Sequence, residues 1–244
     1  MTSILALDTS GDACSVALGR DGAVWHRHTV EPRAHHRLLL PMVEDVFTEA
    51  GCAPAELDAV AFGCGPGSFT GLRIATAVTQ AIAWAHDLTV IGVSTLEIMA
   101  ASAVEADPSA HGVIALLDAR MGECYWNLFR AEQGQVLALQ ADGLAQRDVL
   151  AAAIARHVAT AGGRWLLLGA DLLGDASQLV PQQGELVAAA APDVDARMLL
   201  TLAGRRFEAG EGLPAREAIP RYLRDERRWR RVGDPLPQAD AQQQ

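Results

Sequence analysis

The distribution of apolar residues first predicts short β-strands and then changes to a helical spacing. Apolar runs at 4–8, 14–18 and 23–30 are separated by turn-forming residues, and they predict three hairpin-linked strands. From 39 to 50 the apolar residues instead fall three and four positions apart, which predicts an amphipathic helix that stops at Gly51. The chain therefore begins with the order β-β-β-α.

The alternation of strands and helices continues in the next segment. Strands are predicted over 57–62 and 88–93, with a helix between them at 72–86 that is apolar on most of its sides. A helix of that kind is buried or is covered by a partner. Ser94 begins a third helix, and Glu97 stands at the position that completes a capping box with it.

A second unit with a looser pattern follows. Its predicted elements are strands at 113–118, 123–130, 135–140 and 165–168, and helices at 147–160 and 195–209.

We therefore expect an α/β protein of two domains. Residues 1–104, joined by a C-terminal segment at about 210–232, form the first domain, and 105–209 form a second, smaller one. The polar residues 233–244 are expected to be a disordered tail. Three hairpin-linked strands followed by α-β-α resemble the core of the actin, sugar-kinase and Hsp70 superfamily, so the expected fold is actin-like ATPase (ribonuclease H-like) with a reduced second subdomain.

Composition and charge narrow the classes of function. The chain of 244 residues has a net charge of −10, which disfavours nucleic-acid binding by the whole surface. All 20 basic residues are arginines, and seven of them lie between 216 and 231 with three acidic residues. A basic end on an acidic body predicts docking to something acidic, with a solvated terminal helix as the alternative.

Other features of the composition favour a cytoplasmic protein. The longest apolar runs are too short for a membrane span, and the N-terminus has no basic segment of the kind that begins a secretory signal. The four cysteines are far apart in the sequence and form no C-x-x-C pair, so we expect buried, reduced thiols.

The densest cluster of glycines is the most informative segment. Residues 63–71, Gly-Cys-Gly-Pro-Gly-Ser-Phe-Thr-Gly, join a strand to a helix, which is where α/β proteins place binding sites. The loop could cradle phosphate at the helix N-terminus, but the chain has no lysine and so no P-loop motif. The alternatives are a tight turn that lets the helix pack closely, and a platform whose Phe69 anchors a partner.

The first strand ends in the candidate cofactor-binding residues Asp8, Thr9 and Ser10. Asp8 could hold a metal-bound phosphate while the two hydroxyl groups donate to its oxygens. The alternative is a turn in which these side chains cap the backbone.

The remaining polar motifs predict no catalytic or metal-binding set. His35 and His36 precede a helix and point in different directions. His26 and His28 share one face of a strand, but no third ligand lies nearby in the sequence. No G-x-S-x-G motif is present. Residues 118–123 could contact a ligand across the interdomain cleft or form a hairpin turn.

Six segments together resemble the TsaB (YeaZ) family of bacterial tRNA modification. They are 4–10 (ILALDTS), 35–41 (HHRLLLP), 65–73 (GPGSFTGLR), 92–97 (GVSTLE), 117–120 (LDAR) and 220–224 (PRYLR). The resemblance spans most of the chain, and the glycine motif is its most specific part.

This resemblance implies a role in forming N6-threonylcarbamoyladenosine next to the anticodon of tRNAs that read codons starting with A. In that pathway TsaD transfers the carbamoyl group to adenosine, TsaB joins TsaD through the first two helices of its N-terminal domain, and the ATPase TsaE engages the pair. The chain is thus expected to be a non-catalytic subunit that pairs with itself when TsaD is missing and meets tRNA through the complex.

The resemblance also shows where this chain departs from TsaD. TsaD holds a metal with an H-x-x-x-H motif on the helix after the strand that corresponds to 89–93, and the matching residues here are Thr95 and Met99. These side chains do not suit such a site, so we expect neither catalytic residues nor a bound metal.

The two apolar helices supply the expected contact with TsaD or a second copy. The candidate interface residues are Leu39, Met42, Val46, Phe69, Ile74, Val78 and Ile82. Candidate contacts to tRNA phosphates or an acidic partner are Arg221, Arg224, Arg227, Arg228 and Arg230.

Two rival classes of function stay open. One is an ATP-binding enzyme of the actin-like class that uses Asp8, Thr9 and the loop 65–71. The other is a metallo-glycopeptidase-like hydrolase. No resident cofactor is expected, but weak binding of ATP or ADP at the partner interface also stays open.

Overall fold

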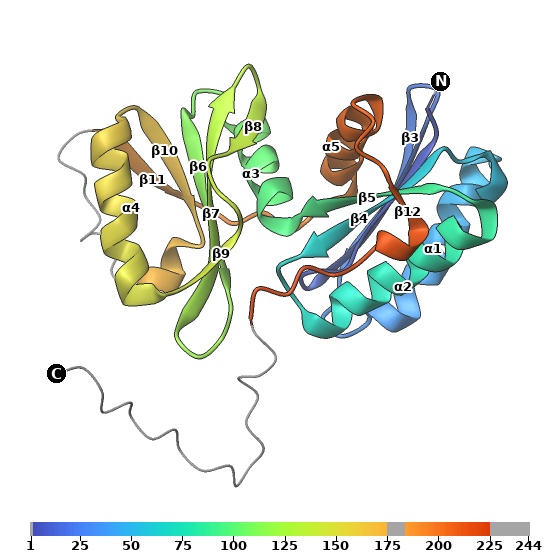
Figure 1. The fold of residues 1–244 in the computed structure, drawn as a ribbon, viewed down its shortest axis with the longest axis horizontal. Coiled ribbons are helices and arrows are strands. Elements are labelled where there is room, and N and C mark those ends of the chain that lie inside the picture. Colours follow the sequence, from blue (N-terminus) through green and yellow to red (C-terminus); the bar gives the residue numbers. More distant parts are fainter. Residues whose placement is uncertain (1, 175–183, 225–244) are drawn as a thin grey trace, which may run out of the picture.

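The computed structural model describes residues 2–174 and 184–224, which form two β-sheets flanked by helices (Figure 1). The strands of the first sheet are β1 (Ile4–Asp8), β2 (Ala13–Arg20), β3 (Ala23–Val30), β4 (Ala59–Gly65), β5 (Thr89–Ser94) and β12 (Leu213–Pro214). They lie in the order β12-β5-β4-β1-β2-β3. Strands β1, β4 and β5 are parallel, whereas β2 and β3 are antiparallel hairpin partners.

Both faces of the first sheet are covered because its strands are apolar on both sides. Helices α1 (His35–Ala50) and α2 (Phe69–His86) pack on one face, where Val16 and Leu18 join their core. Helices α3 (Thr95–Ala106) and α5 (Ala196–Glu208) belong to the core of the opposite face, with Ala17 of the same strand. Alternate residues of β2 thus point to opposite faces, as a period of two requires.

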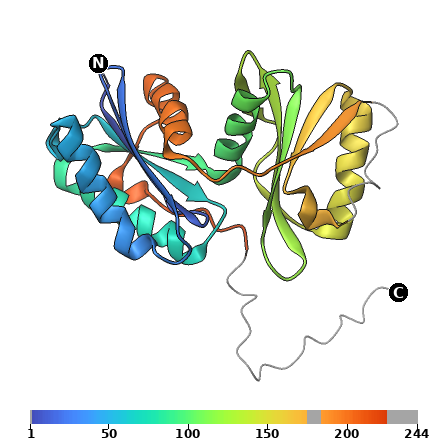
Figure 2. The same ribbon diagram turned by 180° about the vertical axis from the view of Figure 1, so that it is seen from behind.

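The second sheet follows the first along the chain. Its strands are β6 (Gly112–Asp118), β7 (Glu123–Glu132), β8 (Gln135–Ala138), β9 (Gly143–Gln146), β10 (Arg164–Leu168) and β11 (Glu185–Ala189). They lie in the order β11-β10-β6-β7-β8, and β9 pairs with β7. Helix α4 (Arg147–Ala161) covers the outer face, and α3 lies between the two sheets (Figures 1 and 2). Short 3-10 helices are η1 (Pro54–Glu56), η2 (Ala170–Leu173) and η4 (Ala215–Glu217).

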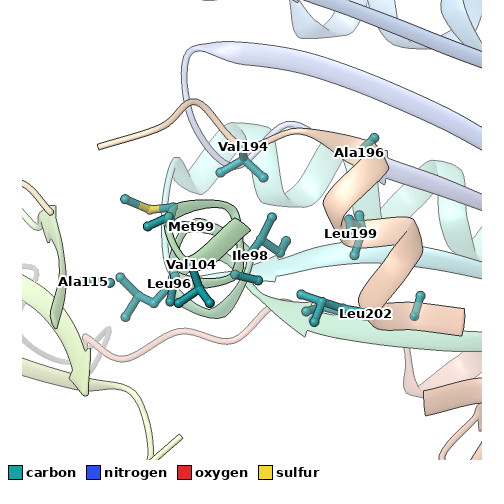
Figure 3. Packing of buried hydrophobic residues seen from close by; sticks show 14 of the residues in the cluster. Leu96, Ile98, Met99, Val104, Ala115, Val194, Ala196, Leu199 and Leu202 are labelled. Atoms are coloured by element: carbon teal, nitrogen blue, oxygen red, sulfur yellow. The ribbon is translucent and has the colours of Figure 1, made fainter. Parts of the chain in front are cut away.

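Helix α5 belongs with the first sheet, which corrects one predicted domain boundary. Leu199 and Leu202 of α5 lie in one apolar cluster with Leu96 and Ile98 of α3 (Figure 3). The same helix packs on β1, β2 and β5. The predicted second domain, 105–209, is therefore too long at its C-terminal end.

The structure also corrects the predicted capping box at the start of α3. The Ser94 hydroxyl donates to Asp142 at 2.7 Å instead of capping its own helix. Glu97 accepts a hydrogen bond from Arg206 at 2.6 Å. Both side chains therefore bind partners far away in the sequence.

Other sequence predictions can be placed on the structure. The four cysteines are buried and free, as predicted. Among the described residues, no helix is both long and apolar enough to cross a membrane. The predicted tail, 233–244, lies outside the described residues.

Candidate functional site

The glycine loop packs directly on the turn that ends β1. A Cβ built on Gly71 would lie 1.9 Å from the carbonyl oxygen of Thr9, and one on Gly67 would lie 2.3 Å from that of Ser10. A Cβ on Gly63 would lie 1.8 Å from Asp8 Oδ2. Glycine is required at 67 and 71 because the backbone of the turn lies against them, and at 63 because the Asp8 carboxylate does.

Hydrogen bonds join the loop and the turn. The Thr9 hydroxyl donates to the carbonyl of Gly71 at 2.7 Å, and the backbone N–H of Ser68 donates to the carbonyl of Ser10 at 2.7 Å. Ser68 also caps α2, because its hydroxyl oxygen accepts the backbone N–H of Gly71 at 3.2 Å. This cap explains why α2 begins at Phe69, three residues before the predicted start.

These contacts fill the space beside Asp8, Thr9 and Ser10, the weak candidates for a phosphate site. The three residues are only 0%, 0% and 3% exposed, respectively. Their neighbours are the chain's own glycine loop, so in this structure the turn has no open face toward a nucleotide. The Asp8–Ser10 hydrogen bonds are those expected of a turn whose side chains cap the backbone, and phosphate binding by these residues stays a prediction.

Asp8 lies in an unusual electrostatic environment. Its Oδ1 accepts hydrogen bonds from the backbone and the hydroxyl of Ser10, both at 2.9 Å. Among the described residues, none hydrogen-bonds its buried Oδ2. Burial raises the pKa of Asp8 to about 7, although the Ser10 hydrogen bonds oppose the shift. Burial and the nearby Asp8 charge likewise raise the pKa of Cys14 to about 11.

The chain's last described segment crosses the other side of the loop. The backbone N–H of Arg221 donates to the carbonyl of Cys64 at 2.7 Å, and its guanidinium pairs with Asp142 at 3.0 Å. Arg224 pairs with Glu123 and also donates to the carbonyl of Ala119 at 2.8 Å.

Two of the predicted RNA or acidic-partner contacts therefore have partners within the chain. Arg221 and Arg224 each pair with a carboxylate of their own chain, and their contact with tRNA or an acidic partner stays a prediction. The other three candidates, Arg227, Arg228 and Arg230, lie outside the described residues.

Residues 118–123 form the predicted hairpin turn between β6 and β7. Asp118 pairs with Arg147 at 2.8 Å, and Glu123 pairs with Arg224. The charges of this turn thus bind groups of the same chain.

Phe69 lies at the surface, as the partner-anchor hypothesis requires. Its exposed fraction is 49%. The Arg73 guanidinium stacks over its ring at 3.7 Å from the centroid and donates to the Tyr222 hydroxyl at 3.1 Å. The ring is therefore held by its own chain on one face.

The structure corrects the predicted interface on α1. Leu39 and Val46 are 1% and 0% exposed, and Met42 is also buried, because all three point into the core beneath the helix. The apolar side chain that α1 presents outward is Leu40, which is 59% exposed.

The predicted residues of α2 lie partly at the surface. Ile74, Val78 and Ile82 are half-buried and pack against the same core. Beside them Trp84 is 75% exposed, and Ala77, Ala81 and Ala85 are exposed as well. The sequence pattern predicts that α2 is apolar on most sides, but periodicity alone does not distinguish Trp84 from its neighbours.

The positions that correspond to the metal ligands of TsaD lie in the core. Thr95 and Met99 are each 1% exposed, and Met99 packs in the cluster between α3 and the second sheet. By contrast, His26 and His28 meet Asp195, a third potential ligand at the start of α5. Asp195 was missed because it follows the histidines by more than half of the chain.

The comparisons with known proteins agree with one another. A family model described as TsaD, tRNA N6-adenosine threonylcarbamoyltransferase, matches residues 29–159. The chain is 36% identical over 235 residues to the tRNA threonylcarbamoyladenosine biosynthesis protein TsaB of Escherichia coli (strain K12), covering 94% of this chain and 97% of that protein.

Two solved structures resemble the chain closely. YeaZ from Pseudomonas aeruginosa is 38% identical with a TM-score of 0.78, covering 91% of this chain and 100% of that one. The other, with the same identity and TM-score and covering 92% of this chain and 100% of that one, is described as an uncharacterized protein with similarity to peptidase YeaZ from Pseudomonas aeruginosa.

The topology and these likenesses define an α/β protein of the actin-like, ribonuclease H-like class, which confirms the predicted fold. The chain belongs to the TsaB family of tRNA threonylcarbamoyladenosine biosynthesis proteins. Thr95 and Met99 lie inside the segment that matches the TsaD model.

Proposed function

We propose that this chain is an accessory subunit in the formation of N6-threonylcarbamoyladenosine in tRNA and acts in the cytoplasm with a TsaD-like catalytic subunit. The Escherichia coli relative is named for this pathway, and the match extends over nearly its whole length. A TsaE-like ATPase engages the pair, and tRNA is met through the complex. A second copy of the chain takes the place of TsaD when TsaD is missing.

The single observation that best supports this assignment is the outward face of α2. Ala77, Ala81, Trp84 and Ala85 follow one another at helical spacing, and all four are exposed. Small residues beside a large aromatic allow another helix to approach closely, and a tryptophan with most of its surface in water gains free energy when it is covered.

Helix α1 extends this apolar surface sideways. An open groove between α1 and α2 is lined by Leu40, Val43, Phe47 and Ile82, among other residues. Val78 and Ile82, which lie beside the exposed positions of α2, are half-buried and pack against the core that α1 and α2 share. A pair of partner helices laid on α1 and α2 would cover both features at once.

The glycine loop fills the space beside the turn at Asp8, which favours an accessory role for the chain over the binding and hydrolysis of a nucleotide. A phosphate could reach Asp8 only if the glycine loop moved away from Thr9 and Ser10 and broke the hydrogen bonds between them. Likewise, Thr95 and Met99 are a buried, partly apolar pair at the positions where the resemblance to TsaD implies two histidines. This pair suits a metal poorly, which favours a partner as the subunit that carries out the transfer reaction.

Reconstitution tests the proposal directly. The chain is mixed with purified TsaD-like and TsaE-like subunits, the enzyme that supplies threonylcarbamoyl-adenylate, and unmodified tRNA. We expect modified adenosine only when this chain and the TsaD-like subunit are both present. Modification that is unchanged when the chain is omitted would overturn the proposal.

Binding and activity measurements on the isolated chain distinguish the two rival enzyme classes from the proposed role. Calorimetry with ATP and Mg²⁺ is expected to detect no micromolar binding. Binding that Asp8→Ala abolishes would instead support an ATP-binding enzyme, and peptidase activity of the isolated chain would support a hydrolase.

A further inference from the structure

Two histidines and an aspartate converge on the face of the first sheet opposite α1 and α2. His26 and His28 are two residues apart on the edge strand β3, so their rings lie on the same side of the sheet. Asp195 precedes α5, and its Oδ1 lies 3.1 Å from His26 Nε2. One ligand atom from each residue lies within 4.8 Å of the other two.

Ser15 of β2 contacts both histidines of this cluster and the start of α5. It pairs directly with His28 in the β2–β3 ladder. Its buried hydroxyl lies 3.1 Å from His28 Nδ1 and 3.3 Å from His26 Nε2, and it accepts the backbone N–H of Ala196 at 2.9 Å. The imidazole nitrogens that face the centre of the cluster are thus fixed by contacts with both the sheet and α5.

We propose that His26, His28 and Asp195 form a binding site for a first-row divalent transition metal ion, for which Zn²⁺ is the representative. Two nitrogen donors and one oxygen donor are a set that zinc accepts, with solvent completing the coordination. Mg²⁺ and Ca²⁺ prefer oxygen donors throughout and fit this set poorly. Within the described part of the chain, this is the one group of at least three such side chains that converges in this way.

A bound ion would connect elements that are distant in the sequence. It would join the edge strand β3 to the start of α5, the helix that follows the second sheet along the chain. The Arg197 side chain, which also pairs with Asp195, is 63% exposed and has room to turn into solvent when the ion binds. The site lies across the sheet from the proposed partner surface, so the two proposals are independent.

Zinc binding by the full chain tests the site. Protein freed of metal with a chelator is titrated with ZnCl₂ by calorimetry, and its Tm is measured with Zn²⁺ and with Mg²⁺. We expect one equivalent of zinc and a raised Tm that the chelator reverses, with no comparable effect of Mg²⁺. His28→Ala should weaken zinc binding at least about tenfold, and His86→Ala, at an exposed histidine on α2, should leave it unchanged.

A second variant separates ligation from the stability of α5. Asp195→Asn retains an oxygen that can cap α5 but loses the charge, so it should also weaken zinc binding without unfolding the chain. Substitution with Co²⁺ should give a ligand-field spectrum that His28→Ala alters. Equal zinc affinity in His28→Ala and His86→Ala would overturn the proposal, and so would the lack of a stoichiometric zinc complex in the wild-type chain. The three residues would then form only a hydrogen-bonded network with Ser15.

Discussion

Arg221 and Asp142 form an ion pair at 3.0 Å that ties the last described segment of the chain to the second sheet. The Asp142 side chain is 2% exposed and also accepts hydrogen bonds from Ser94 and Asn127, both at 2.7 Å. The backbone of Arg221 binds Cys64 in the glycine loop. One residue thus links the loop, the C-terminal segment and the second sheet.

Removal of the arginine should destabilise the fold. Arg221→Ala leaves the buried Asp142 carboxylate with only its neutral partners, and we expect a loss of about 1–3 kcal/mol in the free energy of unfolding. Denaturant unfolding measures this loss. Arg216→Ala is the control, because its pair with Glu217 is exposed and should contribute less than about 1 kcal/mol. Equal effects of the two substitutions would contradict the assigned role of Asp142.

Alanine should have opposite effects at two helical glycines. Gly71→Ala places a methyl group against the Thr9 carbonyl oxygen and should destabilise the chain by about 1–3 kcal/mol. Gly204→Ala in α5 meets nothing within 4 Å and should stabilise it by about 0.5–1 kcal/mol. Thermal denaturation shows whether each variant has a lower or a higher Tm than the wild-type chain. A raised Tm of Gly71→Ala would show that the loop and the turn can separate freely.

Asp8 should make stability depend on pH. Its pKa is raised from 3.8 to about 7 in the folded chain, so the native state binds more protons than the unfolded state between these values. The contribution of Asp8 is therefore largest at low pH and falls as pH rises toward 7, by roughly 3 kcal/mol between pH 5 and pH 8. Asp8→Asn cannot ionise and should flatten this part of the profile. Identical wild-type and Asp8→Asn profiles from urea unfolding would refute the shift.

The partner surface on α2 can be tested at its most exposed large residue. Trp84→Arg places a charge where the proposed helix contact is covered, and it should weaken association with a TsaD-like subunit by at least about 2 kcal/mol. The isolated variant should keep its Tm, since Trp84 is 75% exposed. Val149→Arg on α4, at a residue that is 64% exposed, is the matched control. Calorimetric titration that gives both variants wild-type affinity would exclude this face.

The order of the main elements could be predicted because hydrophobic periodicity is a local property. The predicted strand at 4–8 coincides with β1, and the predicted helix at 39–50 lies within α1, which begins four residues earlier and includes His35 and His36. The strands that the sequence pattern did not predict are β9, β11 and β12. Each is defined by its pairing with a distant strand rather than by a pattern of its own.

The candidate interface was less predictable, because periodicity identifies an apolar face but not what covers it. Leu39 and Leu40 are adjacent and chemically identical, yet they are 1% and 59% exposed, respectively. Only the packing of α1 on the sheet distinguishes the residue that faces the core from the one that faces outward.

The sequence by itself determined the α/β class, the glycines that allow close contact, and the lack of a lysine that excludes a P-loop. The tertiary structure decided what those glycines contact, which is the turn formed by Asp8, Thr9 and Ser10. It also brought Asp195 to His26 and paired Arg221 with Asp142. These outcomes depend on contacts between segments far apart in the chain, and such contacts are set by how helices and sheets pack in three dimensions.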